Sequence, residues 1–370
     1  MSEVSKTVIR PELRALTGIR FGAAFLVFLF HMGAGFAASI GLPHPIVQFL
    51  ENGFLGVSLF FVLSGFILTY TYQDKLDLNF GKLSKYAIAR FARLYPVYLL
   101  ILLAFLPFAM DGLTTYEAVR VLTMTQSWTA PGSSLGWAWV MQAWTLSVEF
   151  VFYLAFPFLL VLMRGFGKRA IWSTTAMTAI AIVALAVPFC NVGGSNSIWM
   201  GSAIPIPIVR LIEFVYGMLL GFIYLRSSSN IGKALREVFV ISILVMIGGL
   251  LSFTNNPYLL SFAVALVGPL LLLLSEGQSI TAKFLGTKFM VLLGGASYVF
   301  YLAQGPVRHT LGYFLEEDIA RAINPIVLLL VSIAIFRYWE QPARIIIKRW
   351  ASSFTQKARS ILSTRMAKLN

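Results

Sequence analysis

Ten long apolar stretches constrain the fold of this 370-residue sequence more than any other feature. Each is close to the roughly 20 residues that a helix needs to cross a bilayer. An open sheet cannot satisfy its backbone groups in lipid, and the strict alternation typical of a transmembrane barrel is missing. The sequence therefore predicts an all-α polytopic membrane protein with about ten transmembrane helices. The stretches lie at residues 21–38, 54–72, 94–110, 139–163, 171–189, 209–225, 238–253, 258–274, 289–307 and 324–340.

The composition leaves little sequence for a soluble domain. Apolar residues make up 58% of the chain and charged residues 12%, against about a quarter charged in soluble proteins. We expect one transmembrane domain over residues 1–345 and a basic, amphipathic cytoplasmic tail over 346–370, resting on anionic lipid. A nucleic-acid partner is excluded, because the basic residues lie between apolar segments. One Cys and three His cannot build a disulfide framework or a Cys/His metal site, so no metal is expected.

The basic residues predict the orientation in the membrane. Most of the 29 Lys and Arg residues fall at the two ends of the chain and on alternate loops. Such residues accumulate on the cytoplasmic side of a membrane protein. Both termini are therefore predicted to be cytoplasmic. The exceptions to the pattern are Arg120, Arg210, Arg308 and Arg321.

Two ionisable residues are predicted near the bilayer centre, where a charge is expensive and marks a candidate site. His31 follows Arg20 by eleven residues, which is about 16 Å along a helix and returns to the same helical face. Glu149 enters from the outer side and is predicted about 15 Å deep, at the level of His31. We expect His31 and Glu149 to pair, because a buried carboxylate needs a partner. A purely structural polar pair is the alternative.

Arginines supply a candidate anion site. Arg90 and Arg93 lie three residues apart, on one helical face, before Pro96. With Arg20 they are predicted at the cytoplasmic surface, remote from the midplane, where paired guanidinium groups suit a polyphosphate. Simple positive-inside anchoring explains them equally well. Ser64 lies in another span, beside a glycine, where helix packing or the close approach of a ligand accounts for the small residues.

Tryptophans gather at the outer edge of the fourth stretch, at Trp128, Trp137, Trp139 and Trp144. Anchoring at the interface is the usual role of such residues, although aromatic faces beside a polar cleft also suit sugar rings. A buried His can take a hydroxyl proton near neutral pH. The pattern thus indicates chemistry across a membrane, with a phosphate-bearing donor inside and an acceptor outside.

The order of these motifs resembles acyltransferase family 3, membrane O-acyltransferases that use acyl-CoA. The resemblance covers most of the chain, and the predicted topology agrees with it. One position departs from the family pattern, because Gln304 stands where a His is common. The matching motifs are Arg20 and His31 with ten residues between them, Ser64-Gly65-Phe66, Arg90-x-x-Arg93, the block from Trp144 to Pro157 that holds Glu149 and Tyr153, and Glu340-x-Pro342.

The resemblance implies transfer of an acyl group, expected to be acetyl from acetyl-CoA, to a hydroxyl of a carbohydrate or lipid-linked glycan. It also implies a multi-pass protein of the bacterial cytoplasmic (inner) membrane that serves exopolysaccharide or other surface-glycan biosynthesis, alongside polysaccharide-assembly proteins. No tightly bound cofactor is expected. The implied roles are general base for His31, its orienting carboxylate for Glu149, donor binding for Arg20, Ser64, Gly65, Phe66, Arg90 and Arg93, and acceptor binding for Trp144, Tyr153 and Gln304.

Two alternatives remain open at this point. Direct transfer and an acyl-enzyme route through Ser64 both fit the motifs. A proton-coupled transporter or flippase of a glycosylated or lipid-linked substrate would also have ten spans and a midplane His and Glu. Transporters tend to show inverted repeats and paired broken helices, and the sequence displays neither.

Overall fold

A computed structural model of the chain describes residues 10–109, 113–128, 139–191, 204–227 and 231–351. Every regular element within these ranges is a helix, which confirms the predicted fold class. In the same ranges eight segments are long and apolar enough to cross a membrane. They are α1 (Arg14–Phe28) continued by η1 (Leu29–Gly33) and α2 (Ala34–Ser39), α3 (His44–Glu51) with α4 (Gly56–Tyr72), α5 (Phe80–Ala109), α7 (Trp144–Arg164), α9 (Ile206–Arg226), α10 (Lys233–Phe253), α11 (Pro257–Ser275), and α15 (Glu317–Ile335) continued to Ala351.

The remaining helices bear on the number of crossings. The pair α13 (Lys288–Leu302) and α14 (Gln304–Phe314) bends by 66° and forms a ninth candidate span. Helix α8 (Lys168–Ala184) has 17 residues and is about 26 Å long, slightly shorter than the hydrocarbon core. If both cross, the number is ten, and the side on which each terminus lies stays a prediction. The short helices are α6 (Thr115–Leu122) and α12 (Ile280–Leu285).

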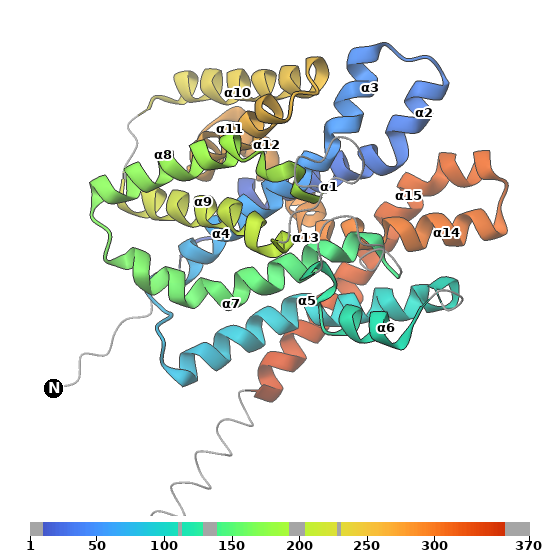
Figure 1. The fold of residues 1–370 in the computed structure, drawn as a ribbon, viewed down its shortest axis with the longest axis horizontal. Coiled ribbons are helices and arrows are strands. Elements are labelled where there is room, and N and C mark those ends of the chain that lie inside the picture. The colour runs from blue at the N-terminus through green and yellow to red at the C-terminus, as the bar shows by residue number, and fades with distance from the viewer. Residues whose placement is uncertain (1–9, 110–112, 129–138, 192–203, 228–230, 352–370) are drawn as a thin grey trace, which may run out of the picture.

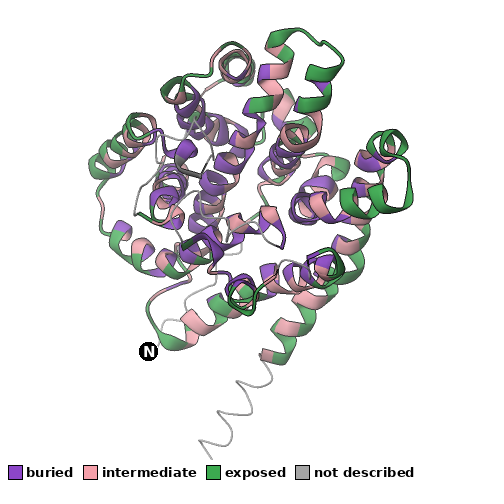
Figure 2. Cartoon of the chain, turned by 45° about the vertical axis from the view of Figure 1, so that its right-hand side comes forward, coloured by how far each residue is buried: buried purple, intermediate pink, exposed green. Residues whose placement is uncertain are grey.

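The long helices pack around a buried centre (Figure 1), and the buried residues concentrate there while exposed ones face outward (Figure 2). Helices α4 and α9 approach closely because glycines face each other's backbone. A Cβ at Gly65 would collide with the carbonyl of Phe214, and one at Gly217 with the carbonyl of Val62. Such contacts between small residues are the usual means of close helix packing in membranes. These contacts hold one face of α4 against α9. Ser64, the residue before Gly65, lies on a different face of α4.

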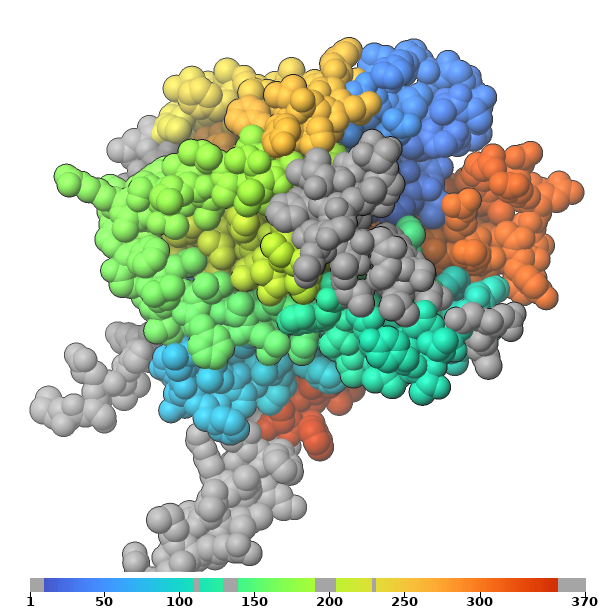
Figure 3. Space-filling view, in the orientation of Figure 1, coloured from blue at the N-terminus to red at the C-terminus, as the bar shows by residue number. Residues whose placement is uncertain are grey.

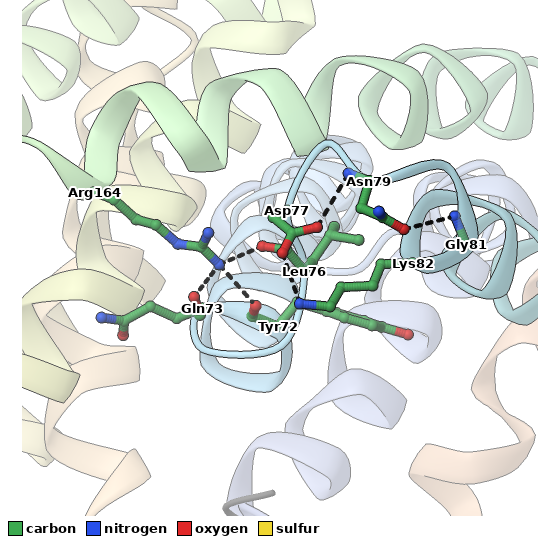
Figure 4. A network of polar contacts seen from close by, with 8 residues as sticks. All are labelled: Tyr72, Gln73, Leu76, Asp77, Asn79, Gly81, Lys82 and Arg164. Carbon is green, nitrogen blue, oxygen red and sulfur yellow. Dashed lines mark hydrogen bonds and ion pairs between the residues drawn. The ribbon is translucent and has the colours of Figure 1, made fainter. Parts of the chain in front are cut away.

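An arginine ties α7 to the end of α4 and to the loop that follows (Figure 4). The guanidinium group of Arg164 donates to the carbonyls of Tyr72 (3.3 Å), Gln73 and Leu76 (2.5 Å). These carbonyls lie at and just after the C-terminal end of α4, where a cation complements the helix dipole. In the same loop Lys82 donates to Asp77 (2.6 Å), and this hydrogen bond holds the pKa of Asp77 below its ordinary value.

The C-terminal helix lies against α5. It is continuous from Glu317 to Ala351, with a π-helical turn, η8 (Phe336–Glu340). The indole of Trp339 donates to the carbonyl of Pro96 (2.9 Å), which joins this turn to the middle of α5. The predicted domain boundary at 345/346 falls inside this helix. Most of the predicted amphipathic tail, residues 352–370, lies outside the described residues, so the tail stays a prediction.

The topology can be tested at the loop between α4 and α5. A single cysteine at Asn79, in a chain whose native Cys190 is replaced by Ser, should not react with an impermeant thiol reagent in intact cells, because the positive-inside pattern places this loop in the cytoplasm. The matched control is Glu316→Cys, at the exposed turn between α14 and α15, which should react. Labelling of the cysteine at position 79 in intact cells would show that the predicted orientation is wrong.

Candidate active site

A cavity of about 130 Å³ lies in the middle of the helix bundle, between α1, α4, α5, α7 and α13. We call it the arginine cavity, because three guanidinium groups reach it from two helices. Within the described ranges, no three His, Cys, Asp or Glu side chains gather in a way that could hold a metal ion. The polar residues that line the arginine cavity are Arg20, Ser64, Arg90, Arg93, Thr145, Glu149, Tyr153, Tyr298 and Tyr301.

Arg20 contributes to the cavity from within the membrane span. Helix α1 begins at Arg14, so Arg20 lies six residues, or about 9 Å, inside the helix. Its charged neighbours are Arg93, Glu149 and Glu340. The expected separation of Arg20 from Glu149 is therefore wrong, whereas its place on the cytoplasmic side stays a prediction. A carboxylate within electrostatic range offsets part of the energy that burying a guanidinium group requires.

Arg90 is held by aromatic side chains. Its guanidinium carbon lies over the rings of Tyr72 (5.4 Å), Tyr86 (5.9 Å) and Tyr153 (5.7 Å), distances at which cation–π attraction is significant. One Nη atom donates to the hydroxyl of Tyr72 (3.1 Å), while Nε is buried without a hydrogen-bond partner. Three rings thus fix the position of a cation and leave a donor group free for a ligand.

Arg93 is paired with a residue that the sequence analysis did not place in the site. Its Nη1 atom lies 2.6 Å from Oε1 of Glu340, and Glu340 is only 1% exposed. Arg90 and Arg93 both line the arginine cavity together with Glu149, so their expected separation from Glu149 is wrong as well. Nη2 of Arg93 is buried and has no hydrogen-bond partner. The Glu340-x-Pro342 motif was the one feature of the sequence analysis that could have placed Glu340 in the site.

Glu149 faces arginines and does not pair with His31. Tyr153 donates to one carboxylate oxygen of Glu149 (3.3 Å), and the charged neighbours of Glu149 are Arg20, Arg93 and Arg90. The expected His31–Glu149 pair is wrong. Glu149 lies beside Arg20. His31 follows Arg20 by eleven residues in the segment α1–η1, which places it about 16 Å from Arg20. Helix α7 begins only at Trp144, so depth counted from the start of the apolar stretch was misleading.

His31 occupies a π-helical turn, η1, a feature frequent at functional sites. Its ring packs against Phe30, with centroids 4.9 Å apart. The charged residue that lies near it is Arg308. His31 is not among the residues that line the arginine cavity.

Of the Ser64-Gly65-Phe66 motif, only the serine faces the arginine cavity. Gly65 packs against α9, and Phe66 is fully buried with its ring 5.7 Å from that of Tyr224. The structure therefore brings only Ser64 of this motif to the arginine cavity, and donor binding by the motif stays a prediction. Successive residues of a helix point about 100° apart, so a three-residue motif cannot present every side chain to one cavity.

The three residues expected to bind the acceptor separate in the structure. Tyr153 lines the arginine cavity. Trp144 lies outside its lining, with its ring 6.2 Å from Phe61 and under the guanidinium group of Arg210 (6.0 Å). Gln304 is fully buried at the bend between α13 and α14, and both of its amide atoms lack a hydrogen-bond partner. Leaving such a group unpaired costs about 1–3 kcal/mol, which indicates a place for a ligand or water.

A second, larger cavity of about 1130 Å³ opens between the segment η1–α2 and the hairpin of α14 and α15, which forms a lobe at one edge of the molecule (Figure 3). We call it the hairpin cavity. Phe36 and Phe108 give it aromatic faces, and Asn324, 4% exposed, has an Oδ1 atom without a hydrogen-bond partner. Met32 and Gly33, which follow His31 in the chain, also line it. Its charged or ionisable residues are Arg308, His309, Glu317, Asp318 and Arg321.

The described residues thus form a multi-span helical bundle with a cavity lined by three arginines. Residues 13–336 match the family described as an acyltransferase domain, Acyl_transf_3, and the chain belongs to this family, acyltransferase family 3. It is thus a membrane-bound acyltransferase, and relatives named O-acetyltransferase support transfer to oxygen.

Two relatives illustrate the similarity. The acyltransferase MdmB of Streptomyces mycarofaciens is 28% identical over 314 residues, which cover 79% of this chain and 78% of MdmB. The O-acetyltransferase OatA of Staphylococcus aureus is 24% identical over 373 residues, which cover 90% of this chain but 57% of OatA. No solved structure matches. The transporter hypothesis draws no support from these comparisons.

Proposed function

We propose that this protein transfers an acyl group, acetyl in the first instance, from acyl-CoA to a hydroxyl of a carbohydrate acceptor. The observation that carries the proposal is the arginine cavity, whose lining holds Arg20, Arg90 and Arg93 but one carboxylate, Glu149; Glu340, outside the lining, pairs with Arg93. Buried guanidinium groups with unpaired N–H donors suit phosphate, which arginine binds with paired, charge-assisted hydrogen bonds. CoA supplies such phosphates at one end and a thioester at the other.

The separation of Arg20 from His31 fits a donor of this shape. About 16 Å of helix lies between them, so a group bound by its phosphates near Arg20 needs a long arm to bring its reacting atom to His31. The pantetheine arm of CoA is such a connector. Ser64, on the cavity wall, would flank that arm.

His31 is the proposed general base. The acceptor oxygen attacks the thioester carbonyl carbon while His31 takes the hydroxyl proton; the new C–O bond forms, the C–S bond breaks, and the proton passes to the departing CoA thiolate. Glu149 would not touch His31 in this scheme. It is a positioning residue that fixes the arginines.

The hairpin cavity is the proposed acceptor port. Phe36 and Phe108 suit the faces of sugar rings, and the unpaired Asn324 supplies a hydrogen-bonding group of the kind that hydroxyls match. His31 lies beside this cavity, because Met32 and Gly33 line it. A carbohydrate or lipid-linked glycan would reach this port from the extracytoplasmic side of the bacterial inner membrane, delivered by polysaccharide-assembly proteins.

Mass spectrometry of surface polysaccharide, from cells with and without this protein, tests the function. We expect an acyl mass to disappear on deletion and to return when the wild-type gene is supplied. Free CoA thiol should also be released when membranes receive acetyl-CoA and that polysaccharide. An unchanged glycan, together with uptake of the glycan into proteoliposomes without CoA, would contradict the proposal.

A further inference from the structure

Positive charge continues from the arginine cavity along the C-terminal helix. Arg344 and Lys348 follow Glu340 at intervals of four residues, so the three share one helical face, with about 6 Å between successive members. We call Arg344 and Lys348 the cationic track. None of the motifs of the sequence analysis includes them.

The contacts of Arg344 connect the track to the cavity. Its Nη1 atom is 3.7 Å from Oε1 of Glu340, beyond hydrogen-bond range, and that oxygen already accepts from Arg93 at 2.6 Å. Arg90 and Arg93 are also charged neighbours of Arg344. Arg344 is one third exposed, so it lies between the Arg93–Glu340 pair and solvent.

Lys348 extends the same cluster. Its charged neighbours are Arg344 and Arg90, and none of the ion pairs in the described part of the chain includes it. It is exposed, one helical turn beyond Arg344, and so lies at the outer end of the row of cations.

The charges of this region do not balance. Among the described residues, five cations, Arg20, Arg90, Arg93, Arg344 and Lys348, lie around two carboxylates, Glu149 and Glu340. Like charges repel one another, and the repulsion is strongest where water is excluded. In addition, Nε of Arg90 and Nη2 of Arg93 are buried without partners. A bound polyanion would both neutralise the excess charge and satisfy these donors.

We propose that the cationic track binds the 3′-phosphate of CoA, while Arg90 and Arg93 bind the pyrophosphate. This inference rests on the proposed function, in which acyl-CoA is the donor. CoA carries two groups of phosphate charge separated by a ribose. The site likewise offers two groups of cations, because Arg344 and Lys348 lie one and two helical turns beyond Glu340, the partner of Arg93.

The test compares CoA with 3′-dephospho-CoA as ligands of the full-length protein in detergent. The wild type should bind CoA at least tenfold more tightly. Arg344→Gln with Lys348→Gln should weaken CoA binding about ten- to hundredfold, the equivalent of one or two charge-assisted hydrogen bonds, and leave 3′-dephospho-CoA within about twofold. Arg344→Lys with native Lys348 should retain part of the preference.

Arg337→Gln is the matched control, because Arg337 is an exposed arginine of the same C-terminal helix, and it should change neither affinity. Equal loss for both ligands, or no loss for either, would overturn the 3′-phosphate assignment. The assignment would also be overturned if the Arg344→Gln, Lys348→Gln variant kept its preference for CoA but no longer bound vesicles containing phosphatidylglycerol. The cationic track would then bind lipid headgroups. A wild type that binds neither nucleotide would instead remove acyl-CoA as donor, and with it both proposals.

Discussion

Replacing His31 with alanine should lower the turnover number by on the order of 10² to 10⁴, the usual contribution of a general base, while acyl-CoA still binds. The physical reason is location: His31 lies about 16 Å along the helix from Arg20, so its loss removes the proton acceptor without disturbing the cluster that holds the donor. The measurement is acetyl transfer at saturating acetyl-CoA, together with CoA affinity for the same purified variant.

The chain offers a matched control for this experiment. It contains three His residues. His44, at the exposed start of α3, lines neither cavity and can undergo the same substitution. His44→Ala should behave as wild type. Near-normal turnover of a well-folded His31→Ala variant would remove His31 from the chemistry and direct attention to Ser64, on the cavity wall.

The sequence predicted the helices well because apolar length is a local property. Each of the ten apolar stretches is helical over most of its length, since lipid leaves the backbone no other way to satisfy its groups. Their starts were predicted less well. Helices α1 and α5 begin seven and fourteen residues before the apolar stretches that start at 21 and 94. The first turns of both helices carry charged residues, which the apolar stretches leave out.

The carboxylate neighbours of the arginines were missed for a tertiary reason. Counting charges places Arg20, Arg90 and Arg93 at the surface, because an isolated guanidinium group is expensive inside a membrane. In the folded chain Glu149 and Glu340 come from other helices to accompany them. Partners more than fifty residues away in the chain cannot be predicted from local spacing. The partner of Glu149 was mispredicted for the same reason, because His31 was the ionisable residue expected at its depth.

Replacing Glu149 with glutamine tests the revised role of this residue. We expect kcat/KM for acetyl-CoA to fall on the order of 10²-fold, mainly through a higher KM. Glutamine keeps the shape but removes the charge near Arg20 and Arg93, and breaking a buried ionic arrangement is more harmful than removing it whole. The gain of one net positive charge would by itself favour the binding of phosphate. However, paired hydrogen bonds depend on fixed guanidinium geometry, so we expect the displacement of the arginines to outweigh the added attraction.

Kinetics separate this role from the one first expected. A residue that orients His31 would lower kcat and leave the KM for acetyl-CoA unchanged, whereas a residue that positions the arginines raises that KM. Glu149→Asp keeps the charge and should restore part of the donor affinity. Tyr153→Phe is the matched control, since it removes only the 3.3 Å hydrogen bond to Glu149 and keeps the ring beside Arg90; its KM should change only a few-fold. A Glu149→Gln enzyme with low kcat and normal KM would return Glu149 to the chemistry of His31, through a rearrangement that the donor would have to induce.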